Sequence, residues 1–136
     1  MPSIAVDTGP LVALFDRNDA HHARALAYFE RATARFVTNL PVITEAVHLL
    51  SFSTGAAQDC LGWVTAAFTI DATTVADVPR IVALLDKYSD LPADFADAAL
   101  VAMCERLGIG AIATFDRDFD VYRLANGKRL RNELRR

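Results

Sequence analysis

Residues 3–15 read SIAVDTGPLVALF and join three features in one short stretch. The run from Ser3 to Val6 is short and apolar, which predicts a buried β-strand. Gly9 and Pro10 open a helical segment that extends to Phe15, because proline is tolerated in the first turn of a helix. Asp7 stands between the strand and the helix. The stretch therefore predicts a strand, an acid and a helix in direct succession.

The rest of the chain alternates in the same way between apolar runs and helical patterns. We expect helices at about 20–31, 41–52, 56–67, 78–88 and 95–107, and strands at about 36–38, 68–70 and 111–114. Asn18 or Asp19 can cap the first of these helices, and Gly108 ends the last. Strands that alternate with helices predict an α/β fold with a mainly parallel sheet covered on both faces.

Three local signals refine this outline. Thr54-Gly55 is expected to separate two helices, and Asn126-Gly127 is a sequence that favours a tight hairpin turn. Val78, Ile81, Val82 and Leu85 have the spacing of the apolar face of an amphipathic helix.

The composition fits one domain, residues 1–136. The chain has 53% hydrophobic residues and shows no internal repeat or Pro/Gly/Ser linker. The N-terminus has no basic leader, and the charge-free apolar run 60–70 is too short to cross a bilayer, so we expect a cytoplasmic protein. Cys60 and Cys104 form neither a CxxC pair nor a zinc pattern and are interpreted as buried apolar residues.

Charge is distributed unevenly along the chain. The net charge of −3 argues against a protein that binds nucleic acid through a general basic surface. Residues 117–136 nevertheless contain seven Lys or Arg and three Asp or Glu, a local balance of +4. No Lys or Arg occurs in residues 1–16, 36–79 or 88–105, although these windows contain Asp7, Glu45 and Asp97. Those acids lack cationic neighbours in the sequence.

Two of the acids follow predicted strands. Asp7 and Asp116 each come after such a strand, and the carboxyl ends of parallel strands meet at the edge of the sheet where ligands bind. We therefore expect these two side chains to lie side by side.

Two further acids interrupt apolar helix faces. Glu45 is spaced with Pro41, Val42, Leu49 and Phe52, and a glutamate in such a stripe either reaches past the helix to solvent or an arginine, or binds a ligand. Asp97 precedes Val101 and Cys104 on one face of its helix, which places it at the mouth of the core. Asp94, three residues earlier, is interpreted mainly as the N-cap of that helix.

Four acids from separate segments that converge without cations create an electrostatic problem. Two unit charges ~4 Å apart repel by about 4 kcal/mol at an effective dielectric near 20. Carboxylates without histidine or cysteine suit Mg²⁺ or Mn²⁺ rather than zinc. Such an ion could also activate water for phosphodiester hydrolysis.

At these residues the sequence resembles the PIN-domain ribonucleases, specifically the VapC-type toxins of bacterial toxin–antitoxin pairs. The matching stretches are VDTGPLVALFDRNDAHHARA, TEAVHLL, DLPADFADAALVAMCERLG and TFDRDFDVYR, and together they extend over nearly the whole chain. The resemblance implies a PIN-like three-layer α/β/α sandwich and Mg²⁺-dependent endonuclease action on RNA, with Mn²⁺ as a possible substitute.

The resemblance also implies roles for individual residues. Asp7 and Asp97 match the main metal-ligand aspartates, Glu45 the second acid and Asp116 the fourth, with Asp118 a nearby supporting or alternative acid. Thr8 and Thr114 would be supporting hydroxyls. Family members are commonly homodimers, and a small antitoxin lays a segment across the acidic groove, where an arginine could satisfy the acids.

Basic residues near the C-terminus are candidates for substrate contact. We expect RNA phosphates to be held by the residues Arg117, Arg123, Lys128, Arg129 and Arg131 and by the rest of the tail to Arg136. The alternative is a solvated, disordered C-terminus.

Other functions also fit parts of the sequence. Asp7-Thr8-Gly9 is the signature of aspartic proteases, but those enzymes are mostly β, whereas this chain has several helical stripes. A non-catalytic PIN-like module that grips a basic protein segment is the main alternative. The pair His21-His22 is interpreted as a surface pair, and Trp63 and Phe68 as core or dimer contacts.

Overall fold

A five-stranded parallel sheet forms the middle layer of the molecule. The computed structural model describes residues 1–135. Its strands are β1 (Ser3–Val6), β2 (Arg35–Asn39), β3 (Thr69–Asp71), β4 (Ala111–Ala113) and β5 (Arg131–Asn132). Their order is β3-β2-β1-β4-β5, and each neighbouring pair is parallel. The central strand β1 lies directly beside β4, with Val6 opposite Ala113.

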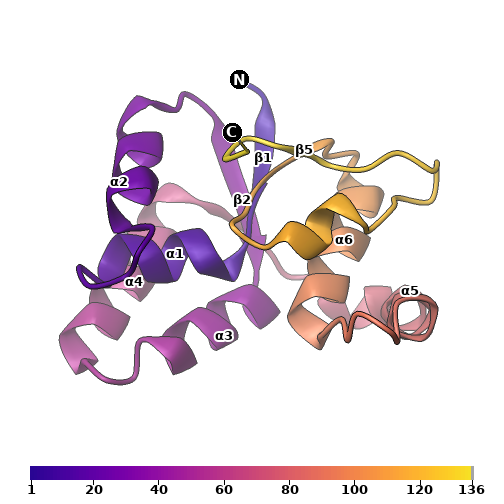
Figure 1. Ribbon diagram of the computed structural model, residues 1–136, viewed down its shortest axis with the longest axis horizontal. Coiled ribbons are helices and arrows are strands. Elements are labelled where there is room, and N and C mark those ends of the chain that lie inside the picture. Colours follow the sequence, from indigo (N-terminus) through magenta and orange to yellow (C-terminus); the bar gives the residue numbers. More distant parts are fainter. Residues whose placement is uncertain (136) are drawn as a thin grey trace.

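Helices cover both faces of the sheet (Figure 1). They are α1 (Thr8–Phe15), α2 (His22–Arg31), α3 (Leu40–Leu49), α4 (Thr54–Ala67), α5 (Thr74–Lys87) and α6 (Phe95–Leu107), followed by a short 3₁₀ helix η1 (Arg117–Asp120). Helices α1 to α4 lie on one side and α5 and α6 on the other. The predicted α/β sandwich with a parallel sheet is confirmed. The helices of the described chain all fall short of what a bilayer-spanning helix needs in length or apolar character.

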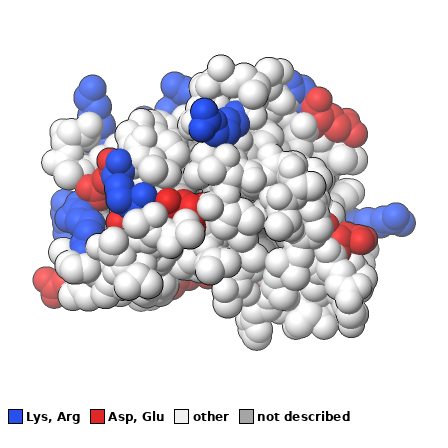
Figure 2. All heavy atoms as spheres, turned by 180° about the vertical axis from the view of Figure 1, so that it is seen from behind, with Lys and Arg blue, Asp and Glu red and all other residues white. Residues whose placement is uncertain are grey.

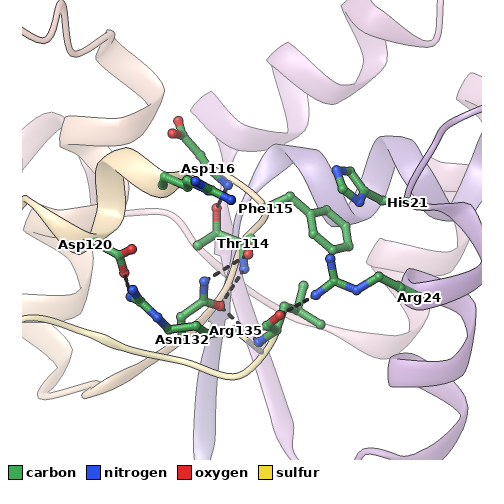
Figure 3. A pocket seen from close by; sticks show the side chains of 10 residues that line it. His21, Arg24, Thr114, Phe115, Asp116, Asp120, Asn132 and Arg135 are labelled. Carbon is green, nitrogen blue, oxygen red and sulfur yellow. Dashed lines mark hydrogen bonds and ion pairs between the residues drawn. The ribbon is translucent and has the colours of Figure 1, made fainter.

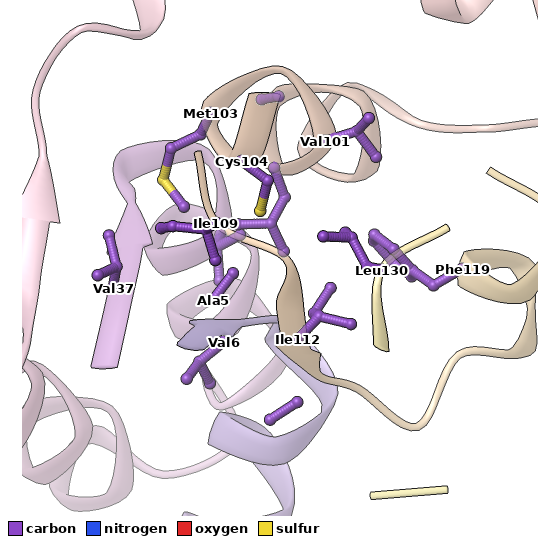
Figure 4. Close-up of a cluster of buried hydrophobic side chains, with 14 of the residues drawn as sticks. Ala5, Val6, Val37, Val101, Met103, Cys104, Ile109, Ile112, Phe119 and Leu130 are labelled. Atoms are coloured by element: carbon purple, nitrogen blue, oxygen red, sulfur yellow. The ribbon is translucent and has the colours of Figure 1, made fainter. Parts of the chain in front are cut away.

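The core lies between the sheet and α6. Residues 98–104 of α6 are all buried, and Val101, Met103 and Cys104 belong to the same buried cluster as the apolar side chains of β1 and β4 (Figure 4). Gly108 ends this helix in the left-handed conformation, with φ at 69°, which is the role that glycine performs best. Because α6 is buried almost all round, any acid near its start is held rigidly.

An aromatic cluster fills the opposite side of the sheet. Trp63 packs against Phe15, Phe29 and Phe68 with ring centroids 5.0 to 5.8 Å apart, and Phe29 and Phe68 contact Phe36. Phe68 is buried. The cluster supports the interpretation of Trp63 and Phe68 as core residues.

The apolar face of α5 differs from the prediction. Val78 and Val82 are 40% and 60% exposed, whereas Ile81 and Leu84 are buried. The buried side of the helix is formed by Ile81 and Leu84, and Asp77, one residue before Val78, lies buried and binds Arg106 of α6. The sequence spacing did not reveal that an acid on this helix is buried in an ion pair.

Some turns and helix ends also lie at other residues than the sequence predicted. Thr54-Gly55 forms the first turn of α4, and Ser53 before it accepts a hydrogen bond from the Ala56 N–H, so the break comes at residues 51–53. Gly127, with φ at 83°, makes a tight turn, but within the described chain this turn joins no antiparallel strands, because β5 pairs in parallel with β4. The predicted hairpin was wrong for that reason.

Helix α3 ends at Leu49, earlier than predicted, and α2 begins at His22, later than predicted. Phe52 therefore lies outside α3, and both Leu49 and Phe52 are at least half exposed. The buried face of α3 is made by Val42, Ile43 and Ala46, with Glu45 half-buried at its edge. The glutamate borders the apolar face and does not interrupt its centre.

Candidate functional site

The strand order reverses direction beside β1, and two of the predicted acids lie there. Asp7 follows β1 directly and is 5% exposed. Thr114 follows β4, and its hydroxyl donates to Asp7 Oδ2 at 2.7 Å and accepts the Asp116 N–H at 2.9 Å. One threonine thus links the acids of the two strands. The prediction that Asp7 and Asp116 lie close together agrees with this arrangement.

Glu45 and Asp97 come from two helices that pack against each other, α3 and α6. Asp97 is half-buried, and its Oδ2 accepts a hydrogen bond from the Tyr122 hydroxyl at 3.1 Å. Asp94 caps α6, because its Oδ1 accepts the Asp97 N–H at 2.8 Å. The N-cap interpretation of Asp94 is therefore confirmed, and the cap fixes the first turn that carries Asp97.

These side chains line one cavity of about 350 Å³, which we call the acidic cavity. Six carboxylates line it: Asp7, Asp19, Glu45, Asp94, Asp97 and Asp116. No Lys or Arg of the described chain lies on its wall, and His21 is the only basic side chain there. The four predicted acids are thus brought together. Asp19 and Asp94 join them, although the sequence indicated Asp19 as one of two possible helix caps and Asp94 mainly as a cap.

Burial and mutual repulsion make these carboxylates difficult to ionise. Burial raises the pKa of Asp7 to about 6. Burial, and then the nearby Asp94 and Asp7, raise the pKa of Glu45 to about 7. Burial, Asp7 and Asp94 raise the pKa of Asp97 to about 8. Loss of water and the absence of a cation both disfavour the charged form.

The donor set fits a hard divalent cation by its chemistry. Its atoms are carboxylate oxygens, joined by the Thr8 hydroxyl, which is buried on the same wall and has no hydrogen-bond partner among the described residues. As the side chains stand, no three His, Cys, Asp or Glu residues between 1 and 135 converge closely enough to hold a metal. Binding would therefore draw the carboxylates toward the ion.

Of the two alternative fourth acids, Asp116 lies on the wall of the acidic cavity. Its Oδ1 accepts the Asp118 N–H at 2.9 Å and so begins η1. Asp118 is half-buried outside that wall, and burial followed by repulsion from Asp116 raises its pKa. Asp118 is therefore placed to support the turn.

Asn132 is a residue of the site that the sequence analysis missed. Its side chain donates to the Thr114 carbonyl at 3.1 Å and accepts the Thr114 N–H at 3.3 Å and the Leu134 N–H at 3.0 Å. It thereby fixes the threonine that connects Asp7 to Asp116. An asparagine in a short edge strand carries no sequence signal for this contact, because the two residues meet only through strand pairing.

The predicted phosphate-binding residues are not gathered in one place. Arg123 uses one guanidinium nitrogen to bind the Asp120 and Tyr122 carbonyls. Lys128 and Arg129 precede β5, so they lie at the opposite end of the strands from the acidic cavity. The structure gives no support to a phosphate contact from these two residues beside the acids.

Two more of the predicted phosphate-binding residues are Arg131 and Arg117. Arg131 pairs with Glu133 at 3.2 Å on the surface, and Arg117 directly follows Asp116. Arg136 lies outside the described residues. The segment before it is ordered, since it contains β5 and the buried Leu134, which does not fit a solvated tail. On the face seen in Figure 2, Lys and Arg form separate small groups and no continuous basic surface.

Comparison with known proteins identifies similar sequences and folds. The family model for the PIN domain matches residues 4–124. A similar solved structure is the crystal structure of Mycobacterium tuberculosis VapC20, described as a sarcin-ricin loop cleaving toxin. The TM-score is 0.79 at 24% sequence identity, over 87% of this chain and 93% of the other. No curated protein matches the chain. At this identity the structural likeness shows the shared fold.

Proposed function

The chain belongs to the PIN-domain family, and from that premise we propose that it is a divalent-metal-dependent endoribonuclease, the toxin of a type II toxin–antitoxin pair that acts in the cytoplasm. The observation that carries the proposal is the acidic cavity, whose wall has six carboxylates and, among residues 1–135, no Lys or Arg. The resemblance to the PIN-domain family is confirmed by the family match, and the fold shared with a VapC protein supports the proposed toxin.

Four of the six acids are proposed to hold the metal, namely Asp7, Glu45, Asp97 and Asp116. Mg²⁺ is the preferred ion and Mn²⁺ its substitute, because both are hard cations that select oxygen ligands. Bound there, the ion would lower the pKa of a water molecule and neutralise charge on the scissile phosphate.

The supporting residues are proposed to hold the acids in place. Thr114 orients Asp7 by a hydrogen bond of 2.7 Å, and Tyr122 orients Asp97 by one of 3.1 Å. The unpaired Thr8 hydroxyl is free to bind water or an oxygen ligand at the same wall. Asp118 supports the turn after Asp116. Groups one step removed from a metal commonly change affinity or activity 10–100-fold when removed.

An antitoxin would need two chemical features to block this site. An arginine could enter the acidic cavity and pair with its carboxylates, as a cation does. Beside it, an apolar groove of about 650 Å³ shares Glu45 and Asp94 with the cavity and exposes Leu40, Val75 and Phe95. We propose that an antitoxin segment with apolar side chains and an arginine occupies both. A homodimer, usual for VapC-type proteins, is also part of the proposal.

The main alternative is a PIN-like module that grips a basic protein segment without catalysis. It uses the same acidic cavity, so only turnover distinguishes the two functions. We expect the purified protein, freed of antitoxin, to cleave RNA with Mg²⁺ or Mn²⁺ and not with EDTA.

Total RNA and ribosomal RNA that contains the sarcin-ricin loop are suitable substrates, since VapC20 is described as cleaving that loop. Sequencing the 5′ ends of the products would identify the cleavage site. Cleavage that persists in EDTA, or in both Asp7→Asn and Asp97→Asn, would refute the metal mechanism. Absence of cleavage with tight binding of a basic peptide would favour the binding module.

A further inference from the structure

A second cavity of about 650 Å³ lies next to the acidic cavity (Figure 3). The two share His21, Phe115 and Asp116 on their walls. The second cavity also contains three arginines, Arg24, Arg117 and Arg135, and we call it the arginine cavity. A basic and an acidic cavity are therefore joined along one wall.

Arg24 and the two aromatic rings form a fixed side of the arginine cavity. The Arg24 guanidinium donates to the Leu134 carbonyl and lies 5.1 Å from the centre of the Phe115 ring. The His21 ring stacks on Phe115 with centroids 4.2 Å apart and an interplanar angle of 13°. These contacts hold the charge of Arg24 in place before any ligand arrives.

The other two arginines differ in how their charges are balanced. Arg135 pairs with Asp120, and its side chain remains 51% exposed. Arg117 is exposed and forms no ion pair with any residue between 1 and 135. Arg117 follows Asp116 in the sequence and lines the arginine cavity, where it provides a positive charge without an ion-pair partner among the described residues.

We propose that the arginine cavity binds the RNA phosphate that neighbours the one placed over the acids. This inference rests on the proposed ribonuclease function and names the residues that hold its substrate. An RNA strand carries a charge on every nucleotide, so a strand with one phosphate at the acidic cavity extends its next charge along the shared wall. Arginine is suited to phosphate because its planar guanidinium donates two parallel hydrogen bonds.

The location of the cavity divides the basic residues that the sequence suggested for RNA contact. Arg117 and Arg135 belong to both proposals, whereas Lys128 and Arg129 belong only to the one based on the sequence. Arg135 follows β5 and lies at the same end of the strands as Asp116, whereas Lys128 and Arg129 precede β5 and lie at the other end. The sequence places all of them in one basic tail. Only the direction of β5 divides them into two groups.

The test measures binding of a fluorescein-labelled single-stranded RNA to an Asp97→Asn background in Mg²⁺, over a series of salt concentrations. We expect Arg117→Gln to weaken binding by roughly tenfold and to reduce the slope of log affinity against log salt by about 0.7, the value for one phosphate contact on a single strand. Arg135→Gln should have a smaller effect, because the Arg135 guanidinium is already paired with Asp120 and is less available to a phosphate.

Lys87→Gln is the matched control, since it removes one charge on α5, away from both cavities. We expect its RNA affinity and salt slope to equal those of Asp97→Asn alone. Lys128→Gln tests the hypothesis from the sequence. A lower slope for Lys128→Gln with an unchanged slope for Arg117→Gln would overturn the proposal. So would tight binding of poly-glutamate by the background and its loss in Arg117→Gln, since the cavity would then serve an acidic protein.

Failure of this proposal is distinguishable from failure of the proposed function. If the parent protein cleaves RNA with Mg²⁺ and Arg117→Gln binds like Lys87→Gln, only the arginine cavity is wrongly assigned. If the parent protein neither binds nor cleaves RNA, both proposals fail.

Discussion

Two groups of acids in this molecule differ in one respect, the presence of an arginine. Asp71 at the end of β3 and Asp77 in α5 both bind Arg106 of α6, at 2.6 and 2.9 Å. In the acidic cavity, six carboxylates line the wall without an arginine from the described part of the chain. We call the first group the paired acids and the second the cavity acids.

The pKa of Asp71, one of the paired acids, and the pKa values of three cavity acids are shifted in opposite directions. Burial alone would raise the pKa of Asp71, but hydrogen bonds from Arg106 and the Thr73 N–H outweigh it and lower that pKa. The pKa values of Asp7, Glu45 and Asp97 rise to about 6, 7 and 8. The charges of the paired acids are thus balanced by an arginine of the fold. The cavity acids need an added ion or a partner protein to balance theirs.

The largest expected effect comes from removing a cavity acid. Asp97→Asn should lower Mg²⁺-dependent RNA cleavage by about a hundredfold or more, because metal stabilisation of the transition state is worth several kcal/mol. In EDTA at a pH above 8, where the Asp97 carboxyl is ionised, the melting temperature should stay the same or rise, since one repelling charge is lost. Cleavage rates and thermal melts measure the two effects. A strongly lowered melting temperature in EDTA would instead show that Asp97 is a structural partner of Tyr122.

The second prediction concerns metal and pH together. Raised pKa values mean that the folded protein binds more protons than the unfolded chain between about pH 4 and 8, so stability without metal should fall as pH rises through this window. Mg²⁺ binds the deprotonated acids. It should therefore add about 2.7 kcal/mol at a hundredfold excess over its Kd at pH 8, and little at pH 5.

Thermal melts across pH, with and without Mg²⁺, test this prediction. The paired acids work in the other direction, because the lowered pKa of Asp71 adds stability that is lost only in acid, as pH falls below the usual aspartate range. A Mg²⁺ effect of equal size at pH 5 and pH 8 would contradict the role given to the cavity acids.

A third experiment gives the cavity acids the arginine that they lack, by substitution of a residue on the cavity wall. Leu49 lies on the wall of the acidic cavity, one helical turn from Glu45, and is 50% exposed. Leu49→Arg should raise the melting temperature in EDTA, reduce the stabilisation by Mg²⁺ and lower cleavage by roughly tenfold. Leu49→Gln, which adds polarity without charge, is the control. An unchanged response to Mg²⁺ in Leu49→Arg would show that charge in this cavity is not what the ion balances.

The smallest effect is expected from breaking the paired acids. Arg106→Gln should lower the free energy of unfolding by about 1 kcal/mol, because its guanidinium is partly exposed and its ion pairs are screened by water. Cleavage should stay close to that of the parent. Arg80→Gln, which breaks the more exposed pair with Glu105, is the control and should cost less. Urea denaturation measures both, and a large loss of cleavage in Arg106→Gln would link the two groups of acids.

Local sequence signals predicted most of the fold because each depends on neighbours along the chain. The strand before Asp7, the cap at Asp94 and the end of α6 at Gly108 are set by nearby residues and occur where expected. The apolar face of α5 was misjudged because Val78 and Val82 are exposed, whereas Asp77 is buried in an ion pair with Arg106, which is distant in sequence. The four predicted acids meet, yet Asp19, Asp94 and Asn132 joined the site without any signal beyond a helix cap or a short strand.

The sequence by itself determined the alternation of strands and helices, and it placed acids after strands and at the edges of apolar helix faces. These features follow from the periodicity of burial and from caps, which act over a few residues. Only the tertiary structure decided which charges meet. The direction of β5 separated Arg135 from Lys128, and the packing of α3 on α6 brought Glu45 to Asp97. Electrostatic interaction depends on distance and solvent in space, which the order of residues along the chain does not specify.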